Sequence, residues 1–162
     1  MITWFLRLIS GEAHFYIGGT THPYMKRWFL IPRNRWLNIY LHKFIRDDDD
    51  RALHDHPWWF ISLMIWGSYF EWTQEHTIWP SERLKIHAVE LVKHRRRAWS
   101  IAFRHAEARH RVTLDNGKPC WTLVVTGRKV REWGFWCPRG FVVWDEFCKP
   151  GNKGEIGKGC GD

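Results

Sequence analysis

Two histidines one residue apart, His54 and His56, open a stretch that continues through apolar, β-branched and aromatic residues to Gly67. Successive side chains of a β-strand point to opposite faces, so residues i and i+2 share a face. On a strand, this spacing presents two imidazoles side by side, and imidazole nitrogens are common ligands of divalent metals. Residues 53–67 are therefore predicted to form one strand that offers two ligands to a single metal ion.

A third ligand is expected from a later strand that begins at His110. Asn116-Gly117 stands between two alternating apolar runs and predicts a hairpin, which aligns His110 opposite Leu123 and places Trp121 on the same inward face. A lone histidine at the head of an apolar face is more often a core residue, but the histidine pair elsewhere favours a ligand. His105, at the start of the preceding turn, is the alternative.

Glu71 is expected to point toward the same interior. With Trp66-Gly67 as a hairpin turn, it lies opposite Ser62 and shares a face with Tyr69 and with the two histidines. A carboxylate facing an interior is costly unless it is paired or ligates a metal. Glu71 is thus predicted to be a fourth ligand or a general base, unless a one-residue slip in register turns it outward.

The arrangement of elements predicts an all-β protein. Nine or ten short strands separated by turns, with little helix, are typical of an antiparallel sandwich or barrel. Residues 1–10 fit a short helix or an edge strand equally well. At 162 residues the chain suits one domain, predicted over residues 1–148, and the glycine-rich polar segment 149–162 is expected to be a flexible tail.

The formal net charge of +8 favours an anionic partner. The basic run Lys93–Arg97 is expected to be a solvated loop, with a phosphate-binding patch that contacts nucleic acid as the alternative. The acidic run Asp47–Asp50 is expected to be an exposed loop, with a hard-cation site as the alternative. The four cysteines form no CxxC pair, which indicates reduced thiols in a cytosol.

The remaining expectations concern location and assembly. Residues 1–10 are apolar, but Arg7 interrupts them and no cleavage-like site follows, so no signal peptide is predicted. No apolar run is long enough to span a membrane, which favours a cytoplasmic protein without a membrane partner. A homodimer is left open.

These motifs resemble the two-motif signature of the cupin superfamily: His54-Asp55-His56 and Gly67, followed by the short strand Trp99–Phe103, a turn and His110. The resemblance covers residues 38–126 and implies a double-stranded β-helix, a jelly-roll barrel. It also implies one divalent metal, which cupins usually hold with two histidines and a glutamate of the first motif and a histidine of the second. The segment 128–135 is similar to the end of small uncharacterised cupin-like proteins from bacteria and phages.

This sequence departs from the cupin pattern at three positions. Phe60 stands where the first-motif glutamate is expected, and His105 and Glu107 replace the usual proline and glycine before His110. A site of three histidines is similar to that of the thiol dioxygenase branch, which holds ferrous iron. Fe²⁺ is therefore the favoured metal, with Zn²⁺ or another divalent ion as the alternative. Glu71 could restore the missing carboxylate.

Three functions follow from these residues. The first is a metal-dependent oxygenase that acts on a small anionic or nucleotide-like substrate. The second is a metal-independent cupin of the sugar-nucleotide epimerase type, with Glu71 and a histidine as base and Tyr69 as acid. The third is a non-catalytic module that binds a ligand or nucleic acid. The residues expected to bind substrate are an aromatic wall and two cations: Trp58, Phe60, Trp121, Arg46 and Arg104.

Overall fold

The computed structural model describes residues 2–48, 52–80, 85–149 and 155–161, almost all of whose regular structure is extended. The helical segments are α1 (Ile2–Ser10), the 3-10 turn η1 (Asp115–Gly117) and α2 (Trp144–Phe147). The strands are β1 (Phe15–Ile17), β2 (Met25–Phe29), β3 (Asn38–Phe44), β4 (Leu53–His54), β5 (Phe60–Trp66), β6 (Ser68–Pro80), β7 (Lys85–Arg97), β8 (Ile101–Arg104), β9 (His110–Leu114), β10 (Cys120–Thr126), β11 (Gly134–Cys137) and β12 (Gly140–Val143).

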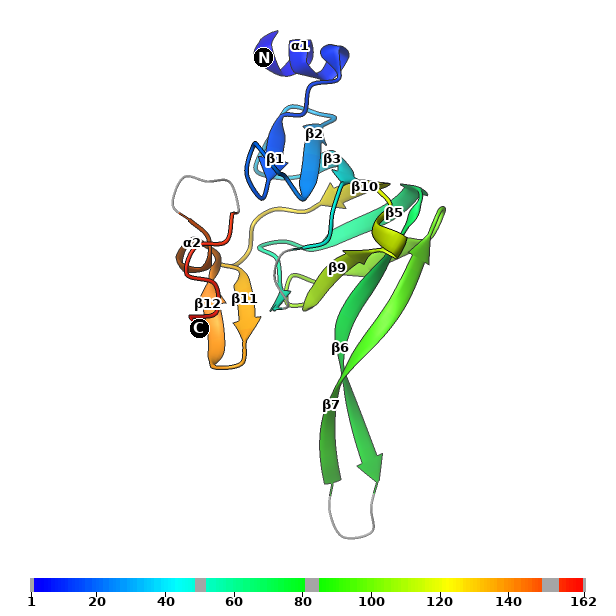
Figure 1. The fold of residues 1–162 in the computed structure, drawn as a ribbon, viewed down its shortest axis with the longest axis vertical. Helices are drawn as coiled ribbons and strands as arrows, with labels where there is room; N and C mark the ends of the chain where they lie inside the picture. The colour runs from blue at the N-terminus through cyan, green and yellow to red at the C-terminus, as the bar shows by residue number, and fades with distance from the viewer. Residues whose placement is uncertain (1, 49–51, 81–84, 150–154, 162) are drawn as a thin grey trace.

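These strands form two six-stranded antiparallel sheets, in the orders β1-β2-β3-β10-β5-β8 and β12-β11-β4-β9-β6-β7. Consecutive strands often lie in different sheets, so the chain crosses repeatedly between them (Figure 1). The inner faces pack together: the rings of Phe44 in the first sheet and Tyr69 in the second lie 5.7 Å apart, beside Met64. This winding is a jelly roll. The predicted all-β, cupin-like jelly roll with little helix is confirmed.

The stretch 53–67 is two strands in different sheets, not the single strand predicted. Leu53–His54 is β4, which pairs with β9 and β11 of the second sheet, whereas Phe60–Trp66 is β5 of the first. Pro57 lies between them, and proline cannot donate to a strand ladder. His56 therefore lies just beyond the end of β4, where the chain crosses from one sheet to the other.

Neither predicted hairpin forms. β5 pairs with β10 and β8, and β6 pairs with β9 and β7, so Trp66-Gly67 is a corner between sheets. Gly67 suits this corner because its φ is +82° and an added Cβ would lie 2.8 Å from that of Cys120. Asn116-Gly117 lies in η1, which joins β9 of one sheet to β10 of the other. The side chains alternate between the two faces of each strand as predicted, but the strands pair differently. Glu71 points inward and Trp121 points outward.

The longest strands, β6 and β7, leave the body as a twisted two-stranded arm (Figure 1). β9 pairs with β6 only over residues 69–73, so residues 74–80 of β6 pair with β7 alone. The basic run Lys93–Arg97, expected to be a loop, is the last part of β7, next to the body. Its odd-numbered residues are exposed, whereas Arg96 points inward. The prediction of a fully solvated run is therefore wrong for Arg96.

The C-terminal segment is not the free tail that its composition predicted. Within residues 155–161, Cys160 forms a disulfide with Cys137 of β11, and Ile156 packs beside the buried Phe147. One disulfide and one apolar side chain hold this segment against the sheet, which outweighs its glycine content. Residues 150–154 and 162 lie outside the described part of the chain.

The expectation of four reduced thiols is also wrong. Two of the four cysteines form the Cys137–Cys160 disulfide, and Cys120 and Cys148 are buried and form no disulfide. Burial raises the pKa of the Cys120 thiol to about 12, so this thiol stays protonated and unreactive at neutral pH.

The N-terminal residues left undecided by the sequence form the helix α1. It contacts β2, where Nε1 of Trp4 donates a hydrogen bond of 2.8 Å to the carbonyl oxygen of Phe29. Within the described residues, none of the helices has the length and apolar character needed to cross a membrane.

Candidate metal centre

Three histidines converge between the two sheets. His54 of β4 is the direct antiparallel partner of His110 of β9, and His56 lies two residues beyond His54 at the crossing. One ligand nitrogen from each lies within 4.8 Å of the others. The structure therefore brings together the three residues predicted as metal ligands.

The distance between two of these nitrogens suits a shared ion. Nε2 of His56 and Nε2 of His110 are 2.8 Å apart. Two nitrogens bound to one ion at about 2.1 Å, with an angle between 90° and 109°, lie roughly 3.0–3.4 Å apart. A small outward shift of the rings would admit the ion. The donor set of three imidazoles matches Fe²⁺ or Zn²⁺.

The lone pairs of His54 and His56 are available at neutral pH. Burial, reinforced by the neighbouring His110, lowers the pKa of His54 to about 3. Burial and the same neighbour also lower the pKa of His56 well below its ordinary value. Metals bind only the unprotonated nitrogen, so this environment favours ligation. Nδ1 of His54 is buried and has no hydrogen-bond partner among the described residues.

His54 also faces a carboxylate from the acidic run. Oδ2 of Asp48 lies 3.7 Å from Nδ1 of His54, and both side chains are largely buried. Asp47 is used differently: its Oδ1 accepts a hydrogen bond of 2.6 Å from the backbone N–H of Leu114. The expected exposed acidic loop is therefore wrong for Asp48, and Asp49 and Asp50 lie outside the described residues.

Glu71 is bound to His110 rather than pointing at the centre of the histidine group. Its Oε1 lies 3.1 Å from Nδ1 of His110, and its Oε2 accepts hydrogen bonds from Arg96 (2.8 Å) and Arg104 (2.5 Å). Burial alone would raise the pKa of Glu71, but the hydrogen bond from His110 and the charges of Arg104 and Arg96 lower it to about 2. Glu71 is therefore an anion that can only accept, and Nδ1 of His110 carries the proton.

Asp55, between the two histidines, anchors the crossing. Its side chain is fully buried and accepts hydrogen bonds from the backbone N–H of Gly134 (2.9 Å), Nε1 of Trp136 (3.1 Å) and Nη1 of Arg131 (2.6 Å). These contacts tie the His54–His56 segment to β11 and to the residues before it. Asp55 thus positions the histidines without being one of the ligands.

Aromatic rings surround the histidines. Phe60 lies 4.8 Å from the ring of His56, and Trp58 packs against Phe60 on the first sheet. Trp133 stacks on His56 at 6.2 Å, and Phe135 lies 5.7 Å from His54. Trp58 and Phe60 were predicted for this wall, but Trp133 and Phe135 were missed, because nothing in the sequence pairs β11 with β4.

The other predicted site residues are placed differently. Trp121 lies on the outer face of the first sheet, where it stacks on Trp28 at 5.3 Å, so its expected position in the site is wrong. The cause is that β10 is not the hairpin partner of β9. His105 is exposed and does not join the group. Tyr69 points inward but packs with Met64 in a separate apolar cluster.

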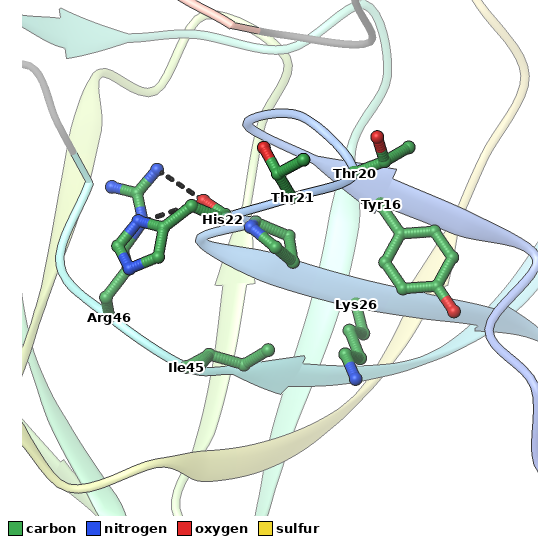
Figure 2. Close-up of a pocket in the computed structure, with 8 residues that line it drawn as sticks. Tyr16, Thr20, Thr21, His22, Lys26, Ile45 and Arg46 are labelled. Carbon is green, nitrogen blue, oxygen red and sulfur yellow. Dashed lines mark hydrogen bonds between the residues drawn. The ribbon is translucent and has the colours of Figure 1, made fainter.

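The two arginines expected to bind substrate are engaged elsewhere. Arg104 is bound to Glu71 by a salt bridge. Arg46 lines a separate pocket beside the loop after β1, where its Nε and Nη2 donate hydrogen bonds of 3.1 and 3.0 Å to the carbonyl oxygen of His22 (Figure 2). Neither guanidinium is directed at the histidines.

Arg27, which the sequence analysis missed, is the cation on the opposing sheet. Its Nε donates a hydrogen bond of 2.8 Å to Nε2 of His42, its strand partner, and its guanidinium lies 4.9 Å over the ring of Tyr40. Burial and the two neighbouring histidines lower the pKa of His56 most, and the charge of Arg27 adds to this shift. No carboxylate among the described residues forms an ion pair with Arg27. Only the pairing of β2 with β3 brings Arg27 and His42 together.

Comparison with known proteins supports the fold. Neither a protein-family model nor a curated protein matches the chain. Among solved structures, a sugar phosphate isomerase of the cupin superfamily from Silicibacter pomeroyi is 11% identical, with a TM-score of 0.51, over 83% of this chain and 88% of that protein. The fold is that of the cupin superfamily.

Two further solved structures are similar to this chain at lower TM-scores. A cupin superfamily protein from Desulfitobacterium hafniense is 10% identical over 65% of this chain and 78% of its own, with a TM-score of 0.46. Fe(II)-HppE with the alternative substrate (S)-1-HPP is 13% identical over 69% of this chain, with a TM-score of 0.49. The match covers 54% of the length of that protein.

Proposed function

We propose that this chain is a metal-dependent cupin enzyme whose ion is held by His54, His56 and His110. The observation that carries the proposal is the 2.8 Å approach of the two Nε2 atoms of His56 and His110 while Nδ1 of His110 is held by Glu71. A carboxylate that fixes the outer nitrogen of a ligand histidine is the usual support of such sites. Three imidazoles leave open positions that suit substrate and dioxygen on Fe²⁺, or an activated water on Zn²⁺.

The surrounding residues favour an oxygenase with a small anionic substrate. Phe60, Trp58 and Trp133 exclude water around the histidines. Arg27 is partly buried, and burial lowers its pKa, yet within the described part of the chain its side chain donates to the neutral His42 and to no carboxylate. A cation held there without a counter-charge is costly. An acidic group of the substrate would supply that charge, which assigns to Arg27 the role first expected of Arg46 and Arg104.

The epimerase-type alternative fits the geometry less well. Burial raises the pKa of Tyr69 above its ordinary value, which makes its phenol a weaker acid. The salt bridges of Glu71 hold its pKa near 2, which makes it a weak base at neutral pH. We assign to Glu71 the orientation of His110, and to Tyr69 no role in proton transfer.

The test is metal analysis of the untagged protein, followed by anaerobic reconstitution with Fe²⁺ and Zn²⁺ and measurement of oxygen uptake with small carboxylates, phosphates and thiols. We expect one ion per chain and its loss in His54→Ala, His56→Ala and His110→Ala. His94→Ala, on the exposed part of the arm, is the matched control and should keep the ion. Full metal content in His110→Ala would refute the assignment.

Oxygen uptake by the iron form then separates the functions. With an acidic substrate, Arg27→Gln should raise KM about tenfold or more at unchanged metal content, because hydrogen bonds to charged groups contribute about 1.5–3 kcal/mol. A metal-free protein that isomerises sugar phosphates would favour the epimerase type. Metal binding without turnover of any substrate would favour a binding module.

A further inference from the structure

The outer face of the second sheet carries a band of cations and aromatic rings. On β7, Arg96 points inward to Glu71, so Lys93, Arg95 and Arg97 point outward. Several of their partners on β6 and β9 are also cations or aromatic residues: Lys93 pairs with Trp72, Arg95 with Phe70, and Trp72 with Arg111. Three adjacent strands therefore build one surface, which we call the cation–aromatic face: Phe70, Trp72, Lys93, Arg95, Arg97 and Arg111.

Contacts within this face show cations on both sides of the rings. Nζ of Lys93 lies 3.9 Å from the ring centroid of Phe70 and 4.9 Å from that of Trp72. The guanidinium of Arg111 lies 4.9 Å from Trp72 on the β9 side. Nε1 of Trp72 donates to Oγ1 of Thr113 at 2.9 Å, which restrains the indole. The rings are partly buried and the outward residues of β7 are exposed.

Most of the positive charge on this face has no internal counter-ion. Arg95 is bound to Asp115, and this is the one ion pair recorded on the face for the described residues. Within the same described part of the chain, Lys93, Arg97 and Arg111 pair with no carboxylate. Nε of Arg111 is buried and without a hydrogen-bond partner there. These groups can accept an external anion without breaking a salt bridge.

We propose that the cation–aromatic face binds single-stranded nucleic acid. Outward residues on one strand are about 7 Å apart, so Lys93, Arg95 and Arg97 form a regular row of charges. Proteins that bind single strands combine such a row, which tracks the phosphates, with aromatic rings on which bases stack. Bases can stack on such rings only where they are not paired inside a duplex, so the aromatic rings between the cations favour a single strand. This site shares no residue with the histidine group.

The test is fluorescence anisotropy of labelled single-stranded 20-mers of DNA and RNA over a range of salt concentrations. We expect binding that weakens with salt, and Lys93→Gln, Arg97→Gln and Arg111→Gln should each lower the slope of log K against log salt by about 0.7. Trp72→Leu should weaken binding roughly fivefold to a hundredfold through lost stacking. Phe70→Leu, read with a thermal melt, is the second stacking variant, because Trp72 also bonds Thr113.

The matched control is Arg35→Gln. Arg35 lies 4.7 Å over the ring of Trp36, so it is another cation–aromatic pair, away from this face. It should leave the affinity and the salt slope unchanged. Absence of binding at low salt, equal loss in Arg35→Gln, preference for duplex, or binding only to anionic vesicles would each overturn the proposal. Metal content should be unchanged in all these variants, so failure here is separate from failure of the histidine site.

Discussion

Glu71 holds Nδ1 of His110 at 3.1 Å, and this contact defines which nitrogen of His110 can bind a metal. Because the ionised carboxylate can only accept, the proton of neutral His110 stays on Nδ1 and the lone pair stays on Nε2. That Nε2 is the atom 2.8 Å from His56. Arg96 and Arg104 keep Glu71 ionised in a buried position, so two cations on two different sheets support the tautomer of one ligand.

The first prediction is that Glu71→Gln weakens metal binding about 10–100-fold without abolishing it, as is typical when the partner of a ligand histidine is altered. Glutamine keeps the shape but loses the charge that orders Arg96 and Arg104. Titration with Zn²⁺ or Fe²⁺ by calorimetry measures the change. Glu75→Gln, on the exposed arm, is the control. Loss of all binding would instead make Glu71 a ligand, and unchanged affinity would remove it from the site.

The second prediction concerns Asp55. Asp55→Ala should lower the free energy of unfolding by about 3–5 kcal/mol, because it removes the buried carboxylate that pairs with Arg131 and leaves two further donors without their acceptor. Asp55→Asn should cost less, since the amide oxygen can still accept from Gly134. Chemical denaturation measures both. Glu132→Gln breaks an exposed pair with Lys129 and should change stability by about 0.5 kcal/mol or less. Equal effects at the two positions would contradict the anchoring role.

Local alternation could be predicted from the sequence, whereas strand partners could not. Glu71 points inward as expected, although its predicted partner Ser62 lies in the other sheet. The reason is that the two-residue period of a strand fixes its faces relative to one another whichever strand it pairs with. The inward position predicted for Trp121 is wrong because it was derived from a hairpin between β9 and β10 that does not form. The predicted alternation along β10 is therefore off by one residue.

The three candidate metal ligands could be predicted from the sequence, but the residues that surround them could not. His54, His56 and His110 have a recognisable spacing and residue type. Arg27 and His42 become neighbours only through the pairing of β2 and β3, which no local pattern indicates. For the same reason, the run Lys93–Arg97 could not be divided into an inward Arg96 and outward neighbours until its strand was known.

The third prediction is that denatured, unreduced protein exposes two reactive thiols and reduced protein exposes four, because Cys137 and Cys160 are paired. Cys160→Ser should lower the free energy of unfolding by about 2–4 kcal/mol, the usual contribution of a disulfide. It should also make the C-terminal segment more sensitive to limited proteolysis, because only non-covalent contacts, the packing of Ile156 and backbone hydrogen bonds to Phe147 among them, then hold the described residues 155–161. Thiol counting and denaturation measure these effects. Four thiols without reductant would show that the pair is not formed.

The fourth prediction is that the metal-free protein loses stability as the pH falls from about 7 to 5. Burial lowers the pKa of His42 and His56 well below the ordinary 6.5, and lowers that of His54 to about 3. Below pH 6.5 the unfolded chain therefore binds protons that the folded chain excludes, so acid favours unfolding. Each histidine contributes up to about 1.4 kcal/mol per pH unit. Glu71 does not contribute to this loss between pH 7 and 5. Its pKa in the folded protein is about 2, against an ordinary 4.5, so the stability that its ionised form adds is lost only as the pH falls below about 4.5.

Denaturation midpoints at pH 7.5, 6.5 and 5.5 measure this slope. His42→Gln should flatten it, since glutamine can still accept the hydrogen bond from Arg27 but cannot take up a proton on unfolding. His105→Gln is the control, because His105 is already exposed in the folded protein and unfolding changes its surroundings little. Saturating Zn²⁺ should raise the free energy of unfolding at pH 7.5. This stabilisation should disappear toward pH 5, because protons then compete with Zn²⁺ for the ligand histidines and also bind the histidines of the unfolded chain. A stability that is constant from pH 7.5 to 5.5 would mean that these histidines are open to water.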